Sequence, residues 1–360
     1  HASAMAALGN NEALDTWRKR QQRRISKEYH AILDIALENA KNARTATLEQ
    51  LIENLSADGV TGLSLETDEL SLDEWTDVPS LTPLHPGRTS AGITGLKLSP
   101  RLSNTFPRIL LCDVDIAISL PHTQRGAHMS RLQSALIAAE SVVLADLDAL
   151  AVHVGESIAA GQPNDGVRVR LDADARFETS SLKTKLPSYV GGRALIEVEF
   201  DGEGKIIRAT RGLVLDIATA CPCTLRYSRL AGARDMGLNS IDGLPPTFTH
   251  SQPGSLKLWI TDRSGMPQIT FAEAFRAAGT GAHLREAVLK RPDEHDLVER
   301  MHRRPQFAED VVRSVAGEIA ASCDGGLQLR VEAHLDESIH PHCAHAVCSG
   351  AVEEFWSTAR

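Results

Sequence analysis

Aromatic residues are scarce in this chain: 8 Phe, 4 Trp and 3 Tyr occur among 360 residues. We therefore expect a core built mainly from Leu, Ile, Val and Ala. No apolar run approaches the ~20 residues that a membrane-spanning helix needs, so we expect no membrane association. Cysteine is also sparse, with 6 residues, and no secretory h-region is present. These two absences exclude a disulfide scaffold and predict a reducing, cytoplasmic setting.

Two common nucleotide-binding loops are missing as well. No GxGxxG follows a strand, and there is no GxxxxGK[ST]. Basic residues are outnumbered, with 38 Lys and Arg against 47 Asp and Glu, which gives a net charge of −9. General nucleic-acid binders are usually basic, so we expect no nucleic-acid partner. A local basic pocket on an acidic protein can still bind an anionic small ligand.

What the chain has in quantity is apolar sequence, 42% of its residues, so it folds. Strand runs and helix runs are separate, which is typical of an α+β fold rather than a βαβ chain. We expect a helical extension and linker over residues 1–75, then two units of similar element order over 76–235 and 236–360. The predicted strands are 110–120, 167–171, 193–200, 205–218, 256–260, 327–335 and 344–352, and the predicted helices are 6–56, 130–160 as one helix or two, 270–290 and 305–321.

The most informative segment follows a predicted strand and reads Ala220-Cys221-Pro222-Cys223-Thr224. Thiols one residue apart are poorly placed to form a disulfide with each other, and Pro222 stiffens the turn between them. A cysteine at a strand end is well placed to project into a cleft. The alternative is a pair of small buried apolar side chains, and the segment by itself does not decide between the two.

One carboxylate and three imidazoles occur within nine residues, from Glu337 to His345. In an extended segment His340 and His342 point to the same side. Paired imidazoles can transfer protons near pH 7 or bind a metal. The alternative is a chance cluster on a surface strand.

Three further segments carry polar groups at the ends of predicted elements. His250 lies in a loop before a strand, where a surface histidine is the plain alternative. A helix is expected to end before Pro292, which leaves Glu294 in a turn. Ser130 is expected to cap the helix that follows it, where backbone N–H groups favour an anion. A thiolate, an imidazole and a carboxylate together suit Zn²⁺ with one position open to water.

A set of motifs in this order resembles GTP cyclohydrolase type IB, the prokaryotic enzymes that make the first pterin of folate synthesis. The resemblance runs from about Asp77 to Val352. It implies a tunnelling fold with two tandem ββααββ-like units, antiparallel sheets joined into a barrel between subunits, and helices outside. It also implies a homotetramer with active sites between subunits. The motifs are TQRGAHMSR (123–131), ACPCT (220–224), THSQ (249–252), KRPDE (290–294), PQFAEDVVR (305–313) and ESIHPH (337–342).

The resemblance also implies a divalent metal, which is Zn²⁺ or else Mn²⁺ or Fe²⁺, and a set of site residues. These are Cys221, His250 and Glu294 as metal ligands; Cys221, Glu337, His340 and His342 as catalytic residues; Glu309 as the contact to the guanine edge; and Arg125, His128, Ser130, Arg131, Lys183 and Lys185 as contacts to the triphosphate.

The implied reaction is hydrolysis of GTP at C8, release of formate and closure to 7,8-dihydroneopterin triphosphate. Cys221 and His250 are 29 residues apart, a longer spacing than the family pattern, and THSQ replaces the more usual AHNQ. Three alternatives stay open. One is a guanine-nucleotide hydrolase that stops at a ring-opened formamidopyrimidine. Another is a tunnelling-fold nitrile reductase, although its NADPH-binding motif is not visible. The third is a non-catalytic tetrameric binding protein.

Overall fold

The computed structural model describes residues 89–121, 124, 126–242, 244, 247–287 and 289–358. The chain divides between Thr76 and Asp77 into two units, and every described residue belongs to the second unit. The helix predicted over residues 6–56 therefore lies outside the described residues. Within the described ranges, no helix is both long and apolar enough to cross a bilayer.

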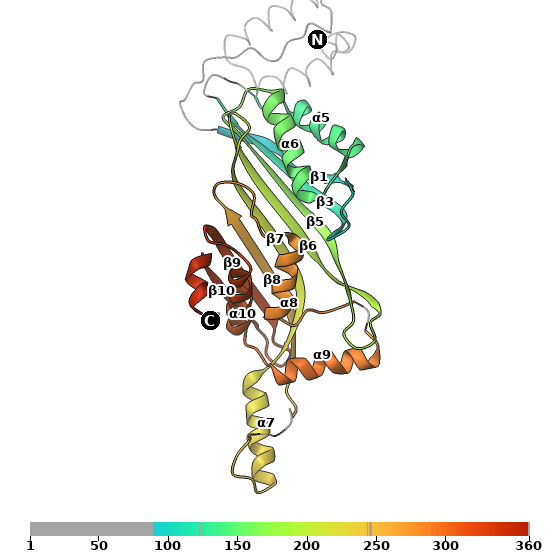
Figure 1. Ribbon diagram of the computed structural model, residues 1–360, viewed down its shortest axis with the longest axis vertical. Helices are drawn as coiled ribbons and strands as arrows, with labels where there is room; N and C mark the ends of the chain where they lie inside the picture. Colours follow the sequence, from blue (N-terminus) through green and yellow to red (C-terminus); the bar gives the residue numbers. More distant parts are fainter. Residues whose placement is uncertain are drawn as a thin grey trace, which may run out of the picture. The chain divides into compact units, whose positions relative to one another are not determined.

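Eight strands of the second unit form one sheet in the order β1-β3-β5-β6-β7-β8-β9-β10 (Figure 1). Every neighbouring pair in this sheet is antiparallel. The strands are β1 (Thr89–Leu98), β3 (Arg108–Leu120), β5 (Gly166–Ser180), β6 (Pro187–Asp201), β7 (Ile206–Ala220), β8 (Ser251–Asp262), β9 (Leu327–Asp336) and β10 (Cys343–Ala351). Two short strands, β2 (Arg101–Leu102) and β4 (Val143–Leu144), pair in parallel apart from the large sheet.

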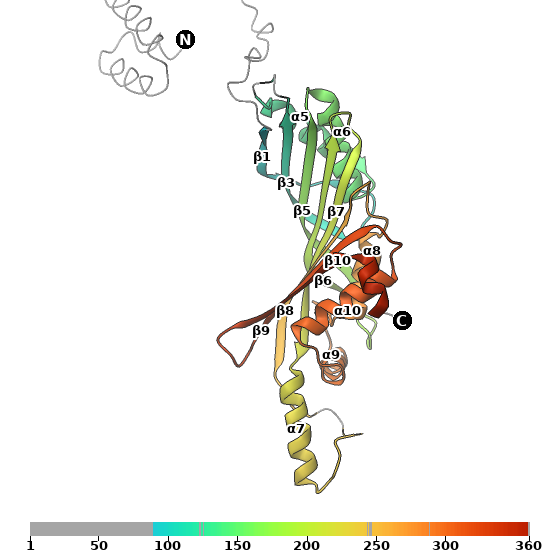
Figure 2. The same ribbon diagram turned by 90° about the vertical axis from the view of Figure 1, so that its left-hand side faces the viewer.

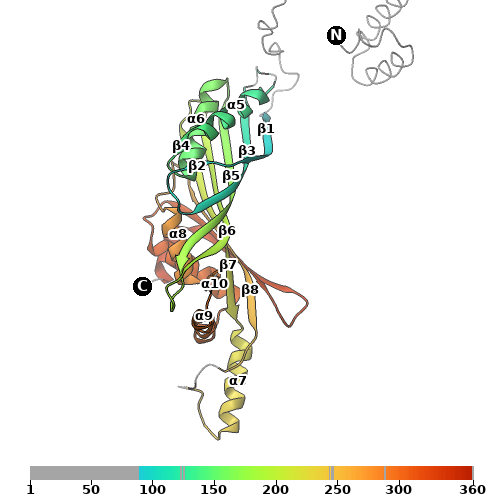
Figure 3. The ribbon, with the colours of Figure 1, turned by 90° about the vertical axis from the view of Figure 1, so that its right-hand side faces the viewer.

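The main helices cover one face of this sheet, as the two side views show (Figures 2 and 3). Two helices follow the first two long strands, and three follow the sixth. The order ββααββ therefore occurs twice, with two additional helices in the second copy: one between its first two strands, and a third helix after its second strand. The predicted α+β fold is confirmed. The helices are α5 (Met129–Ser141), α6 (Leu147–Gly161), α7 (Pro222–Asp235), α8 (Phe271–Gly281), α9 (Arg291–Arg303), α10 (Ala308–Ala321) and the terminal 3₁₀ helix η2 (Val352–Thr358).

Alternating burial explains why these segments form strands. Along β9 the odd-numbered residues from Leu327 to Leu335 are buried, and the even-numbered ones are half-buried or exposed. Successive side chains of a strand point to opposite faces, so one face of β9 packs against α10. The core between sheet and helices includes Phe177 of β5, whose ring stacks on Phe275 of α8 with centroids 5.1 Å apart.

The opposite face of the sheet is polar, and we call it the helix-free face. Cross-strand ion pairs form on it. The guanidinium of Arg193 lies 2.7 Å from Asp172, 2.8 Å from Asp174 and 3.2 Å from Asp113. The residues that define the helix-free face below are Asp172, Asp174, Arg193, Lys257, Arg330, Glu332 and His334.

Helix α8 is shorter than predicted and ends at Gly281 instead of residue 290. A Cβ on Gly281 would lie 2.7 Å from the backbone of Val315, so α8 and α10 approach too closely for any other residue there. The chain beyond leaves the helix and bridges two strands, pairing Leu284 with Ile217 and Glu286 with Val190.

Pro292 was expected to mark the end of a helix, but it is the second residue of α9. Proline is tolerated in the first turn of a helix, because the N–H that it lacks would have no partner there. Glu294 therefore lies in the first turn of a helix and not in a turn that follows one. The stretch between Cys221 and His250 was also expected to be a loop, but part of it forms helix α7.

Candidate active site

Cys221 and His250 lie side by side because β7 and β8 are paired. The last pair of these strands joins Ala220 to Ser251. One residue further on, the backbone N–H of Cys221 donates to the carbonyl oxygen of His250 at 3.2 Å. The hydroxyl of Thr249 also donates to the carbonyl oxygen of Cys221, at 2.9 Å. Two residues far apart in the sequence thus meet at one end of the sheet, where Cys221 is a half-buried free thiol.

The pairing of β8 with β9 brings Glu337 to the same place. His250 Nδ1 lies 3.1 Å from the hydroxyl of Ser338, and His250 Nε2 lies 4.0 Å from Glu337 Oε2. The side chains of His250 and Glu337 are only 11% and 15% exposed. The amide of buried Gln252 donates to Glu337 Oε1. Sequence reasoning gave Gln252 no role, because the predicted strand began at residue 256, whereas β8 begins at Ser251 and makes Gln252 a buried strand residue.

His340 and His342 lie on the turn between β9 and β10, with ring centroids 5.1 Å apart and an interplanar angle of 18°. Both are exposed. The N–H of His340 donates to the carbonyl oxygen of Glu337 at 3.3 Å. The segment is a turn rather than the extended strand assumed from the sequence, so turn geometry and not strand alternation brings the two rings together.

Glu294 is exposed near the start of α9, and this helix packs against the end of β7. The contact is apolar: Leu297 and Met301 of α9 pack on Ala218 and Ala220. Within the described part of the chain, Cys221, His250 and Glu294 do not bring their ligand atoms within 4.8 Å of one another. The structure therefore joins Cys221 to His250, and it places Glu294 on a neighbouring element.

Asp293 was not singled out from the sequence, yet it fixes α9 in place. It is 3% exposed and accepts the backbone N–H groups of Lys183 and Thr184, each at 3.0 Å, together with the hydroxyl of Thr184. The N–H of Lys290 adds a fourth bond at 3.3 Å. Burial alone would raise the pKa of Asp293, but these hydrogen bonds hold it well below its usual range. The loop between β5 and β6 is thereby attached to α9.

The predicted triphosphate contacts fall into two groups. Lys183 and Lys185 are exposed on the loop that Asp293 holds, and the ammonium of Lys183 pairs with Asp296 at 3.0 Å. Lys185 has a left-handed backbone with φ 58°. This loop joins the end of β5 to the start of β6, and the start of β6 lies at the same end of the sheet as the end of β7. These lysines therefore lie at the Cys221 end of the sheet.

The second group lies at the start of α5, at the opposite end of the sheet (Figure 1). Ser130 was expected to cap this helix, but the N-cap position belongs to His128, two residues earlier, which has a left-handed backbone with φ 43°. Ser130 is therefore inside the first turn. The guanidinium of Arg131 lies 3.4 Å from the carbonyl oxygen of Gly161. Arg125 lies outside the described residues.

Glu309 is the second residue of α10 and is exposed. The start of α10 is fixed against β7, because the hydroxyl of Thr219 donates to the carbonyl oxygen of Gln306 at 2.8 Å. Asp310 accepts the N–H of Phe307 at 3.0 Å and caps the helix. Glu309 thus follows closely on a segment that contacts the strand leading into Cys221.

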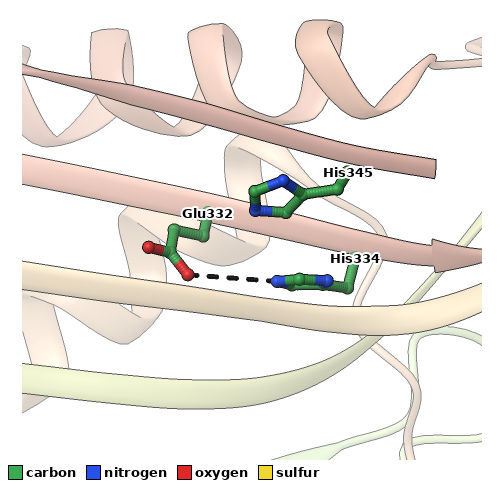
Figure 4. A group of neighbouring side chains, drawn as sticks. All are labelled: Glu332, His334 and His345. Atoms are coloured by element: carbon green, nitrogen blue, oxygen red, sulfur yellow. Dashed lines mark ion pairs between the residues drawn. The ribbon is translucent and has the colours of Figure 1, made fainter. Parts of the chain in front are cut away.

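One group of three potential ligand side chains does gather within 4.8 Å among the described residues: Glu332, His334 and His345 (Figure 4). Sequence reasoning noted His345 without a role and missed the other two. Their signal was a Glu-x-His alternation on a strand, which places both side chains on one face. Burial, together with His345 and Lys257, lowers the pKa of His334, and Glu332 opposes that shift.

Solved structures with a related backbone include a uricase from Arthrobacter globiformis, which is 9% identical with a TM-score of 0.43 and covers 75% of this chain and 96% of its own. A uricase from Bacillus fastidious is 10% identical with a TM-score of 0.42 and covers 74% and 95%. The strand order described above, and not these distant similarities, establishes the fold.

Curated relatives are closer in sequence. A "GTP cyclohydrolase MptA" of Thermoplasma volcanium is 28% identical over 280 residues, which are 76% of this chain and 94% of the relative. A "GTP cyclohydrolase FolE2" of Akkermansia muciniphila is 28% identical over 268 residues, 71% of this chain and 89% of the relative. Residues 88–346, more than half of the chain, match the family model described as type I GTP cyclohydrolase folE2. The chain therefore belongs to the type I GTP cyclohydrolase folE2 family, and the resemblance stated from its motifs is confirmed.

Proposed function

We propose that this chain is a metal-dependent GTP cyclohydrolase that hydrolyses GTP at C8 and forms 7,8-dihydroneopterin triphosphate and formate. Family membership supports GTP as the substrate. The observation that carries the mechanism is the meeting of Cys221, His250 and Glu337 at one end of the sheet, fixed by the contacts of Ser338 and Gln252.

The donor set at this place suits a divalent cation. Cys221 and His250 are joined through their backbones, and a thiol and an imidazole both belong to the ligand types that Zn²⁺ prefers. The contact of His250 Nδ1 with Ser338 leaves Nε2 as the ring atom that faces Glu337. Cys221 and His250, with Glu294 as third ligand, would hold the metal. When bound, such a cation supplies the Lewis acidity that makes water a nucleophile at neutral pH.

The remaining steps of the proposal are assigned to protein side chains. His340 and His342 carry protons to the ring nitrogens of the purine as its imidazole ring opens, since imidazoles transfer protons efficiently near pH 7. Their exposed position on the turn leaves both rings accessible to a substrate. Glu337, bound by Gln252, stays a hydrogen-bond acceptor beside them. Glu309 accepts the N–H groups of the guanine edge.

The residues predicted to contact the triphosphate fall into two groups that lie far apart, and this separation supports active sites between subunits. Cys221 and Lys183 lie at one end of the sheet, whereas His128, Ser130 and Arg131 lie at the other. One chain cannot bring both groups to one substrate, but two chains packed side by side can. We therefore include a homotetramer, with sheets joined into a barrel, in the proposal, together with the cytoplasmic location expected from the sequence.

A product assay tests the reaction. Purified protein is incubated with GTP and either Zn²⁺ or Mn²⁺, and the products are identified by mass. We expect formate and a fluorescent pterin. A formamidopyrimidine as the end product would favour the ring-opening alternative, and intact GTP under all metal conditions would contradict the proposal.

The ligand role of Cys221 is tested with a matched pair of cysteine variants. We expect Cys221→Ala to abolish turnover and lower bound metal, because the site loses its thiolate donor. Cys223→Ala removes an exposed thiol two residues away and should keep both. Full activity with full metal occupancy in Cys221→Ala would overturn the assignment.

A further inference from the structure

The cluster of Glu332, His334 and His345 is built on two paired strands and not on a loop. His334 and His345 are directly opposite each other in the β9–β10 ladder, and their ring centroids are 4.2 Å apart with the rings tilted by 34°. Glu332 precedes His334 by two residues and so shares its face of the strand. Figure 4 shows the three side chains converging from the two strands.

From this arrangement we propose that Glu332, His334 and His345 bind a divalent transition-metal ion of the Zn²⁺ type, at a site separate from Cys221 and His250. All three ligand atoms lie within 4.8 Å of one another. Zn²⁺ bound at ~2.0–2.1 Å requires ligand atoms roughly 3.3 Å apart. His345 is exposed, and the side chain of His334 is 41% exposed, so small ring rotations close the remaining gap.

Arg330 positions the carboxylate for this role. Its Nε donates to Glu332 Oε1 at 2.8 Å, and Glu332 Oε2 faces His334 Nε2 at 3.9 Å. A carboxylate held through one oxygen offers the other as a ligand, in the way that outer groups orient metal ligands elsewhere.

Two positively charged side chains near the site determine which metal ions we expect it to bind. Arg330 and Lys257, the residue opposite Glu332 on β8, both disfavour a positive ion. Only ions that bind imidazole strongly overcome that charge, so the site should take Zn²⁺ and exclude Mg²⁺ and Ca²⁺, which prefer oxygen ligands.

A metal at this site would join β9 to β10 close to the turn that carries Glu337, His340 and His342. His345 lies three residues after His342, and His334 three residues before Glu337. A cross-link at that distance restrains the turn without contacting a substrate. The site would therefore be structural.

Zinc stoichiometry tests the proposal. Chelator-treated protein is titrated with Zn²⁺ by calorimetry, and metal content is measured after gel filtration. We expect about two equivalents per chain for the wild type, about one for Cys221→Ala, and none for Cys221→Ala combined with His345→Ala. His302→Ala, whose ring nitrogen contacts a backbone carbonyl on α9, is the control and should not change the count.

Glu332→Gln keeps the size of the side chain and should weaken binding of the second zinc equivalent at least tenfold, while the thermal unfolding of the metal-free protein stays unchanged. The proposal fails if the double variant keeps its last equivalent, or if Cys221→Ala binds no zinc. If Cys221→Ala keeps both equivalents and His345→Ala then removes one, the second site stands and the assigned active-site metal does not.

Discussion

His283 is a buried imidazole between the connections that lead to α9 and α10. It is 5% exposed, and its Nε2 donates to the carbonyl oxygen of Arg304 at 3.1 Å. Its own carbonyl oxygen accepts the N–H of Ala218 at 2.9 Å. Burial lowers the pKa of His283 from 6.5 to about 4, so the folded protein holds this ring neutral at pH 7.

The depressed pKa predicts acid sensitivity. Between pH 6.5 and 4 the unfolded chain binds a proton at His283 and the folded chain does not. The stability from the neutral ring is therefore complete above pH 6.5 and is lost as the pH falls toward 4. Lowering the pH from 7 to 5 should cost on the order of 2 kcal/mol of unfolding free energy. Denaturant unfolding at both pH values measures it. His283→Gln, which can donate but cannot titrate, should show a smaller loss, and an equal loss would refute the prediction.

A variant of Glu309 tests whether this side chain contacts the guanine base. In the proposed site Glu309→Gln presents an NH₂ to the guanine donors and removes a charge-assisted hydrogen bond worth ~1.5–3 kcal/mol. We expect kcat/KM for GTP to fall roughly tenfold or more with stability near normal.

The neighbouring carboxylate provides the control for that variant. Asp310 caps α10 through the N–H of Phe307, so Asp310→Asn should lower the melting temperature and leave kcat/KM almost unchanged. Unchanged kinetics in Glu309→Gln would remove Glu309 from the site.

Helix α9 shows why element boundaries near the site were hard to predict. Its sequence is mostly charged, with few apolar residues to reveal a helical period. Pro292 was taken as a helix end although it lies in the first turn. What holds α9 is a buried acceptor, Asp293, whose donors on the loop of Lys183 and Thr184 are about 110 residues away. Such a contact leaves no local signal in the sequence.

Adjacent residues of this helix should separate stability from metal binding. Asp293→Asn places a donor against backbone donors, so we expect the melting temperature to drop by several degrees while bound metal is retained. Glu294→Gln, on the exposed side, should keep the melting temperature and lower metal content. Calorimetric unfolding and metal analysis of both variants check this. If Asp293→Asn lost metal and Glu294→Gln lowered the melting temperature, Asp293 would be the metal ligand and Glu294 the residue that fixes the helix.

Seven of the eight strands of the large sheet were predicted from the sequence, because period-two burial such as that of β9 is local. The edge strand β1 was not predicted; most of its residues are exposed or half-buried, so the alternation is weak. The break between α5 and α6 was also within reach of the sequence. Contacts that depend on strand register could not be predicted from the sequence. The contact of Gln252 with Glu337, and that of His345 with His334, arise only when β8, β9 and β10 are aligned. The closeness of His340 and His342 was foreseen, but for a strand and not for a turn.

At the scale of the whole sheet, the outer strands matter most. β1 and β10 are the two edge strands, and an exposed edge is a template for pairing with another chain. The helix-free face is polar and has no covering layer within the described residues. Both features fit a sheet that is completed by further copies of the same chain.

A complementation experiment tests whether the active site is shared. Cys221→Ala and Arg131→Ala each remove a group from opposite ends of the sheet, and each homo-oligomer should be inactive or slow. Co-expressed in equal amounts, they should recover about one quarter of wild-type activity, because that fraction of two-subunit sites receives both intact groups. Native mass should correspond to four chains. No recovery in mixed oligomers would place both groups in one subunit's site or exclude Arg131.

The backbone hydrogen bond between Cys221 and His250 indicates which insertions and deletions this protein should tolerate. Strand pairing sets the separation of the two backbones, and the length of the connection through α7 does not. The part of that connection after α7 can therefore change in length without moving either backbone, provided that Ser228 of α7 keeps its hydrogen bond to the carbonyl oxygen of Phe248. Loop length is thermodynamically inexpensive, since doubling it costs only about 0.6 kcal/mol. The segment after α7 is accordingly a place where an inserted label should leave the pairing of β7 with β8 intact.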